Sequence, residues 1–355
     1  MKKIFVLALA AVMLSVSCVH EFPVATPADV VLKLTFNTDM PYYKTVYFPE
    51  DTKSVSAMSE ELGFDPQDFS DHQSYDVRYI IEAYRMLSDG SYGREAAKRW
   101  VFTDEDASVM DDYNFKVSID EGKYLFRAWA DFVEPGSEDD LYYETSNWKS
   151  GIRLNSSDGY DGATDWRDSY AGNVEIEVIR FGSEIEPVSG VIPMNRPHGK
   201  YFFLTNDLDE FVTKVLLTKA KEDDTKAPQF DINDYSFVIT YTSFVPNSYN
   251  IHTDRANDSA PTATFETSLT QLDETRAVMG FDYVITGTQG NTSVRVGLQL
   301  KDKDGSVLAE HSNINIPVNA SQYTIVEGRF LMQESSGGVA IDPGFNGPDI
   351  VVPVN

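Results

Sequence analysis

The only cysteine of the chain, Cys18, follows a short apolar segment with a charged start. Two lysines precede an almost unbroken apolar run from Ile4 to Val16, and Ser17 supplies the small residue that a signal peptidase accepts. The run is too short to span a membrane and has the features of an export signal. A thiol in this place can accept a diacylglyceryl group, and each buried methylene contributes about 0.8 kcal/mol to membrane binding. The pattern predicts a signal peptide over residues 1–17 and lipidation of Cys18; an ordinary secreted protein is the alternative.

The other residues match no catalytic pattern. Five histidines occur, and no two have the spacing of a metal site. The sequence contains neither a Gly-x-Ser-x-Gly elbow nor a glycine-rich phosphate loop before a helix. The 56 acidic residues would supply carboxylate pairs by chance, which leaves a glycosidase as an open alternative. We expect a protein that is not an enzyme and that has no cofactor apart from the covalent lipid.

One loop carries the carboxylates of a hard-cation site. Asp158, Asp161 and Asp165 lie within eight residues that also contain two glycines. Carboxylate oxygens are calcium ligands, but the spacing departs from that of an EF-hand and no glutamate closes the loop. A calcium site at these three residues and a plain solvated turn are therefore both open.

The segment from Leu141 to Tyr170 is rich in aromatic residues, among them Trp148, Tyr160 and Trp166. Aromatic rings interleaved with polar residues can form a stacking platform for sugars or an adhesive surface. The same rings can instead pack against a sheet edge. Exposed, coplanar rings would indicate sugar binding, and buried rings would indicate packing.

The last residues have the pattern of a short strand on a flexible bridge. A glycine- and proline-rich stretch over residues 337–348 precedes a segment in which Ile350, Val352 and Val354 share one face. Pro353 cannot donate a ladder hydrogen bond, so this strand belongs at a sheet edge. The three apolar residues are a candidate donor strand for a neighbouring subunit, by β-strand addition. Pairing with the chain's own second domain is the alternative.

Charge and cysteine usage limit the partners and the source of stability. The formal charge is −27, from 29 Lys and Arg against 56 Asp and Glu. Such a chain repels phosphates, which argues against nucleic acid as a partner. It also stays off anionic lipid surfaces, which leaves an acyl anchor as the membrane contact. One cysteine can form no disulfide within the chain, so stability must come from buried apolar side chains.

The elements that must position these residues are short strands. Apolar and polar residues alternate between turn residues along most of the chain, which predicts an all-β fold of two tandem β-sandwich domains. We expect a tether over 18–29, an N-terminal domain over 30–190 and a C-terminal domain over 191–355 with the terminal strand. The stretch 37–74 is polar and reads mainly as loop. The clearest strands are 30–36, 75–84, 113–119, 123–133, 172–179, 235–241, 280–285 and 293–300.

One amphipathic helix is expected in the second domain. Asp207 has the position of its N-cap, and Glu210 three residues later has that of a capping-box partner. Leu208, Phe211 and Val212 begin an apolar face at helical spacing. We expect this face to cover one side or edge of a sheet.

Seven short boxes along the chain together resemble a known family. The boxes are Cys18–Pro23, Tyr75–Ile81, Gly122–Tyr124, Trp129–Val133, Met194–Lys200, Asp207–Phe211 and Gly337–Ile341. They resemble fimbrillin-like, type V pilus lipoproteins of Bacteroidota, and within these an uncharacterised group similar to fimbrial anchor and accessory proteins. The resemblance covers nearly all of the mature chain. It implies two transthyretin-like, Greek-key β-sandwich domains on a lipid-anchored protein of the outer membrane, at the cell surface.

The same resemblance implies a role in cell adhesion or fimbria assembly, with other fimbrial subunits as partners. Stalk subunits of the family lose their first strand to an arginine-specific protease, whereas anchor proteins keep the first strand and the lipid. Here no arginine precedes Arg78, which itself falls in an expected strand. The resemblance thus implies an anchor-like or accessory protein. The alternatives are a surface glycan-binding lipoprotein, with Trp148, Tyr160 and Trp166 as contact residues, and a purely structural envelope protein.

Overall fold

The computed structural model describes six ranges of the chain, namely residues 27–48, 75–104, 110–156, 159–179, 187–222 and 227–332. Cys18, Asp158 and the tail residues Ile350, Val352 and Val354 lie outside these ranges, so their predicted roles stay predictions. No helix in the described ranges is long and apolar enough to cross a membrane.

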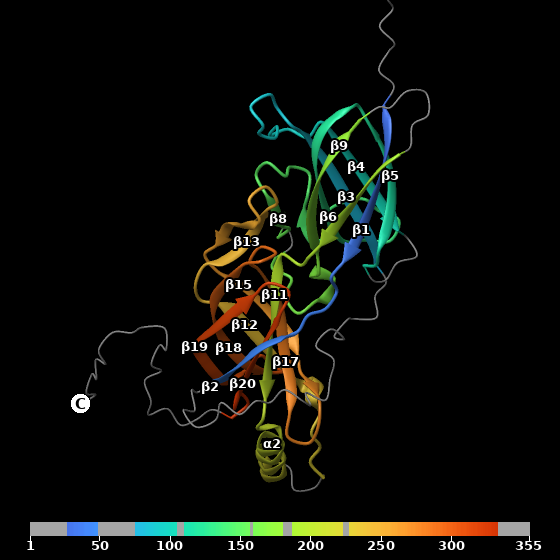
Figure 1. The fold of residues 1–355 in the computed structure, drawn as a ribbon. Helices are drawn as coiled ribbons and strands as arrows, with labels where there is room; N and C mark the ends of the chain where they lie inside the picture. Colours follow the sequence, from blue (N-terminus) through green and yellow to red (C-terminus); the bar gives the residue numbers. More distant parts are fainter. Residues whose placement is uncertain are drawn as a thin grey trace, which may run out of the picture.

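The fold is all-β, as the sequence predicts, with two sandwich domains stacked one above the other (Figure 1). The N-terminal sandwich has a three-stranded sheet in the order β10-β1-β5 and a four-stranded sheet in the order β4-β3-β6-β9. Alternate residues of β1 are fully buried between the two sheets, as period-two patterning predicts. The strands are β1 (Ala28–Phe36), β3 (Asp76–Arg85), β4 (Lys98–Asp104), β5 (Tyr113–Ile119), β6 (Gly122–Val133), β9 (Tyr170–Val178) and β10 (Val188–Met194).

The C-terminal sandwich has a five-stranded sheet, β16-β17-β11-β20-β2, and a four-stranded sheet, β15-β12-β18-β19. Strands β11 and β17 lie inside the five-stranded sheet and are buried along their whole length, charged residues included. The strands are β2 (Tyr42–Phe48), β11 (His198–Thr205), β12 (Tyr235–Tyr241), β15 (Ala263–Ser268), β16 (Thr270–Gln271), β17 (Ala277–Ile285), β18 (Asn291–Asp302), β19 (Val307–Asn319) and β20 (Tyr323–Gly328).

A fifth sheet joins the two domains. Its order is β14-β13-β8-β7, in which β7 (Tyr143–Glu144) and β8 (Ile152–Leu154) come from the N-terminal half, and β13 (Val245–Asn250) and β14 (Arg255–Ala260) come from the C-terminal half. Strands β8 and β13 pair at the junction of the two domains. Two short 3-10 helices, η1 (Asp165–Arg167) and η2 (Ile232–Asp234), complete the described elements apart from α2.

Two details of the predicted domain organisation need correction. The boundary at residue 190 falls inside β10, which runs to Met194 and pairs in parallel with β1, so the whole strand belongs to the N-terminal sandwich. The stretch read mainly as loop contains β2, which pairs in parallel with β20 at the edge of the C-terminal sheet. Figure 1 shows this blue strand among the orange and red strands of the other domain. The chain therefore crosses to the C-terminal sandwich after β1 and returns before β3.

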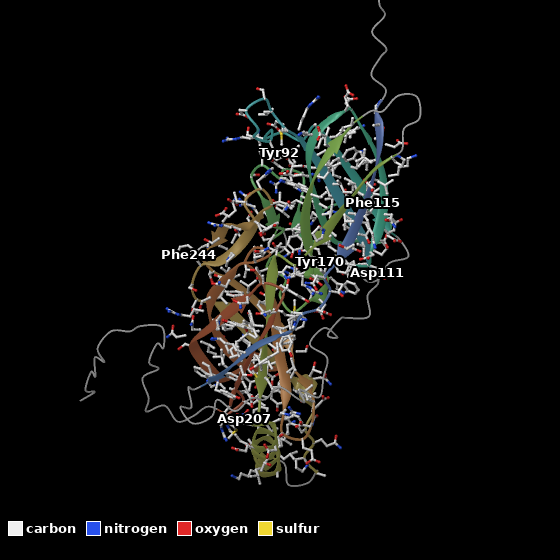
Figure 2. The ribbon with its side chains drawn as sticks, viewed as in Figure 1. Tyr92, Asp111, Phe115, Tyr170, Asp207 and Phe244 are labelled. Carbon is white, nitrogen blue, oxygen red and sulfur yellow. The ribbon has the colours of Figure 1, made fainter. Side chains whose placement is uncertain are left out.

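The expected helix is present as α2 (Leu208–Glu222), but its predicted capping box is not formed. The Asp207 carboxylate instead accepts hydrogen bonds from the backbone N–H groups of Leu331 (3.3 Å) and Met332 (2.9 Å). Glu210 forms an ion pair with Arg329. Both acidic side chains thus bind the segment after β20, and Figure 2 shows Asp207 beside the start of α2.

Candidate functional site

The two tryptophans of the predicted stacking platform lie inside the protein. Trp148, between β7 and β8, is 2% exposed and packs in an apolar cluster at the domain junction. Trp166, in η1, is 7% exposed and meets the rings of Tyr75 and Phe132 edge-on, with centroid distances of 4.8 and 5.0 Å. Their faces are therefore unavailable to a sugar, and the stacking-platform prediction is corrected to a packing role for both residues.

Tyr160, the third residue of that platform, belongs to a buried ionic cluster. Its hydroxyl donates to the Asp282 carboxylate at 2.7 Å, and the guanidinium of Arg167 lies 4.8 Å from its ring centroid. Arg167 and Asp282 form an ion pair in which the side chains are 3% and 1% exposed. Tyr241 donates a further hydrogen bond to Asp282 at 2.7 Å. These contacts hold the ring of Tyr160 against the second domain, so the ring does not form part of a stacking platform.

The opposite charges of this cluster stabilise one another. Burial opposes the positive charge of Arg167, but the Asp282 carboxylate and the neighbouring tyrosines together outweigh that effect and keep the pKa of Arg167 above its ordinary value. Burial raises the pKa of Asp282, with Arg167 as the main opposing influence. Removing either partner would leave an uncompensated charge in the interior.

The predicted calcium ligands are not brought together in the described residues. Asp165 forms an ion pair with the buried Lys200 and accepts a hydrogen bond from the Tyr283 hydroxyl at 2.8 Å. The carboxylate of Asp165 is therefore neutralised by an ammonium group rather than by a cation from solvent. Asp161 has an exposed side chain, and no cluster of three possible metal ligands occurs among the residues described.

A second buried ion pair continues the cluster. Arg196 binds Asp168 through two parallel hydrogen bonds of 2.8 and 2.9 Å, and it also donates to the backbone oxygen of Thr38 at 2.6 Å, in the crossing segment between β1 and β2. Burial alone would raise the pKa of Asp168, but Arg196 outweighs it and the net shift is downward.

His198 completes the cluster as a neutral residue. Its Nε2 accepts a hydrogen bond from the backbone N–H of Ser169 at 3.0 Å, which requires that nitrogen to be unprotonated. Burial lowers the pKa of His198 from 6.5 to about 3, although Asp168 opposes the shift. Residues in or next to η1, in the N-terminal half, thus bind residues in or next to β11 and β17, in the C-terminal half. We call this set of ionisable residues the interdomain clamp: Asp165, Arg167, Asp168, Arg196, His198, Lys200 and Asp282.

The described residues also line a partly open cavity of about 710 Å³ between the domains, beside the sheet that joins them. We call it the interdomain cavity. Five separate segments supply its lining, so no local sequence pattern could have revealed it. The lining residues are Tyr84, Tyr92, Gly93, Arg94, Leu125, Arg127, Asn147, Lys149, Ser150, Asn250, His252 and Thr253.

Arg127 of β6 is the half-buried cation of this cavity. Its guanidinium donates to the backbone oxygens of Ile251 and His252, and it lies 5.8 Å from the ring centroid of Tyr84. Burial lowers the pKa of Arg127, with the neighbouring acidic groups opposing only in part. Burial, and next the charge of Arg127, lower the pKa of His252. The cavity wall therefore carries a partly desolvated positive charge.

Comparisons with solved structures return fimbrial and polysaccharide-related proteins at low similarity. The fimbrial anchor protein Mfa2 from Porphyromonas gingivalis is 10% identical, with a TM-score of 0.40, over 80% of this chain and 82% of that chain. The tip fimbrial protein Mfa3 from the same organism, with a C-terminal truncation, is 9% identical, with a TM-score of 0.34, over 81% of each chain. A candidate polysaccharide-binding protein from Bacteroides thetaiotaomicron is 13% identical, with a TM-score of 0.40, over 80% of each chain.

The sequence comparisons give a family without an assigned activity. A search of curated proteins found no match. The model of a family described as "Family of unknown function (DUF6562)" matches residues 26–354, which includes both sandwich domains. The chain therefore belongs to the DUF6562 family.

Proposed function

We propose that the protein is a lipid-anchored subunit of the cell envelope that acts in cell adhesion or fimbria assembly, as an anchor-like or accessory component that keeps its first strand. The position of β1 carries this proposal. It lies between β10 and β5 and pairs with both along most of its length. Val30, Leu32 and Leu34 are fully buried, so losing β1 would open the N-terminal core. A subunit that exchanges a strand at this position would have to lose β1 and fill its N-terminal core with a strand from a partner.

The surroundings of Arg78 support retention of the strand. Arg78 is the first arginine of the chain and lies in β3, where its side chain is 2% exposed. It forms ion pairs with Asp131 (2.7 Å) and Asp140 (2.9 Å), the first of which is fully buried. A protease specific for arginine must bind an extended chain, so it would have to unfold this sheet before it could cut here.

In this proposal the two ends of the chain make the external contacts. The lipid on Cys18 holds the protein at the outer membrane, on the cell surface. The tail residues Ile350, Val352 and Val354 add a strand to a neighbouring fimbrial subunit. The glycan-binding alternative loses support, because two of its three predicted contact residues, Trp148 and Trp166, are buried.

Photo-crosslinking in living cells of the native host tests the tail contact. A photoreactive amino acid replaces Val352 in one strain and Phe244, which is 69% exposed on the C-terminal domain, in a matched control strain. We expect the probe at 352 to form adducts with a fimbrial subunit and the probe at 244 to form none with it. Adducts only within the same chain would contradict the proposed contact, because the tail would then pair with its own domain.

A further inference from the structure

We propose that the interdomain cavity binds an acidic saccharide, through the carboxylate of a uronic-acid-type sugar. This site is separate from the strand contacts of the proposed function and does not depend on them. Its volume of about 710 Å³ falls in the range of roughly 300–1,000 Å³ that is usual for small-molecule pockets. Both domains contribute to its wall, and such junctions are frequent places for ligand sites.

The charge of the lining is opposite to that of the protein. The chain has 56 acidic and 29 basic residues, yet the lining contains Arg94, Arg127 and Lys149 and no aspartate or glutamate. Of these cations, Lys149 forms an ion pair with Glu95, whereas Arg94 and Arg127 have no ion pair with an acidic group in the described ranges. A cleft lined by one sign of charge concentrates the field and attracts ligands of the opposite sign. The lining therefore favours an anion within a molecule that otherwise repels anions.

Arg127 and His252 have hydrogen-bonding capacity that the fold does not use. The Nε of Arg127 and the Nε2 of His252 are buried and have no hydrogen-bond partner among the described residues. Buried polar atoms in folded proteins nearly always have partners, so these exceptions call for a bound group such as a water, an ion or a ligand. A guanidinium matches the planar, two-oxygen geometry of a carboxylate. The Arg127 guanidinium thus fits a carboxylate better than a neutral ligand.

The remaining lining residues suit the hydroxyl groups and the ring of a sugar. Asn147, Ser150, Asn250 and Thr253 carry amide and hydroxyl groups, which can both donate and accept hydrogen bonds. Tyr92, on the loop after β3, is half-buried and supplies an aromatic ring at the cavity wall (Figure 2). Leu125 is the one aliphatic side chain of any size in the lining, so a purely apolar ligand would find few partners.

Titration calorimetry on the full mature chain tests the site with defined probes. The acidic probe is trigalacturonate, and the neutral probe is its fully methyl-esterified form, which keeps the sugar rings and removes the charge. We expect saturable binding of the acid, at least ~10-fold weaker binding of the ester, and weaker binding of the acid at higher salt. Equal affinity for the two probes, or no binding of the acid, would overturn the proposal.

Three variants locate the binding. Arg127→Gln removes the most buried cation of the lining. Arg94→Gln removes an exposed one and is expected to leave the fold intact, so the test stands even if Arg127→Gln does not fold. Lys214→Gln makes the same charge change on the exposed face of α2, away from the cavity (Figure 1). We expect each arginine variant that folds to lose at least ~10-fold in affinity for trigalacturonate and the lysine variant to keep it.

Unchanged binding in Arg94→Gln and in a folded Arg127→Gln would place the sugar elsewhere and overturn the proposal. Tighter binding of a tri-aspartate peptide than of trigalacturonate would overturn the assignment to a saccharide.

Discussion

At the scale of single residues, the molecule is unusual for the charges that it buries between its domains. Lys200 and Asp282 stand in β11 and β17, two strands buried along their whole length. A lysine or aspartate within an apolar strand indicates from sequence alone that a buried partner exists, because an isolated charge cannot remain in the interior. The partners could not be predicted, since Asp165 and Arg167 lie in a loop more than thirty residues away in sequence from either strand. This is also why the aromatic and acidic residues of that loop suggested a sugar platform and a calcium site.

The Arg167–Asp282 pair gives the first prediction. Arg167→Met leaves Asp282 buried without its counter-ion, and we expect the free energy of unfolding to fall by about 3–5 kcal/mol. Arg153→Met is the matched control, because Arg153 forms an ion pair with Asp258 in which both side chains are about half exposed. That control should lose no more than about 1 kcal/mol. Urea denaturation followed by tryptophan fluorescence measures both, and similar losses in the two variants would contradict the clamp.

His198 gives a prediction on pH. Because burial lowers its pKa from 6.5 to about 3, the unfolded chain takes up a proton as the pH falls through this window while the folded chain does not. Stability is therefore lost as the pH falls, by at most about 1.4 kcal/mol per pH unit from this residue. His198→Gln can still accept the hydrogen bond of the Ser169 N–H group but does not titrate, so its unfolding free energy should fall less steeply between about pH 7 and about pH 4. Urea denaturation across this range compares the two proteins, and parallel profiles would show that His198 is not held neutral.

At the scale of elements, the sequence was most informative for strands in which apolar and polar residues alternate. It was least informative for strands at the edges of sheets. The strands with clear alternation, such as β1 and β12, were predicted, because burial of one face imposes a period of two. The strand β2 was missed, since an edge strand buries little and its residues show no fully buried face. The residues that line the interdomain cavity were not predicted. They come from distant segments, and local sequence patterns do not encode contacts between such segments.

The helix α2 gives the prediction at this scale. Its apolar face was visible in the sequence, but the true partners of Asp207 come from residues 331 and 332, far along the chain. We expect Asp207→Ala to lower the free energy of unfolding by about 1.5–3 kcal/mol, because two backbone N–H groups lose a charged acceptor. Asp209→Ala, an exposed acidic residue in the first turn of α2, should change it by less than about 1 kcal/mol. Chemical denaturation of both variants, with limited proteolysis of the segment after β20, checks this, and equal effects would refute the docking role of Asp207.

At the scale of the whole molecule, three features join the domains. They are the crossing strand β2, the sheet that pairs β8 with β13, and the interdomain clamp. Each places residues of one half in the core or sheet of the other half. The two sandwiches are therefore connected at three separate places.

This connection predicts cooperative unfolding. Scanning calorimetry of the mature chain should give a single transition with equal calorimetric and van't Hoff enthalpies. In Arg167→Met the transition should move to lower temperature and broaden or divide, because one of the three connections is weakened. Two well-separated transitions in the unmodified protein would mean that the domains fold independently.

The proposed function requires that the protein keeps both its lipid and its first strand. Intact-mass analysis and N-terminal fragmentation of the native protein, extracted from membranes with mild detergent, measure both features in one experiment. We expect a chain that begins at an acylated Cys18 and includes β1. A mature chain that begins beyond Phe36 would contradict it, because the protein would then have lost the strand that fills its N-terminal core.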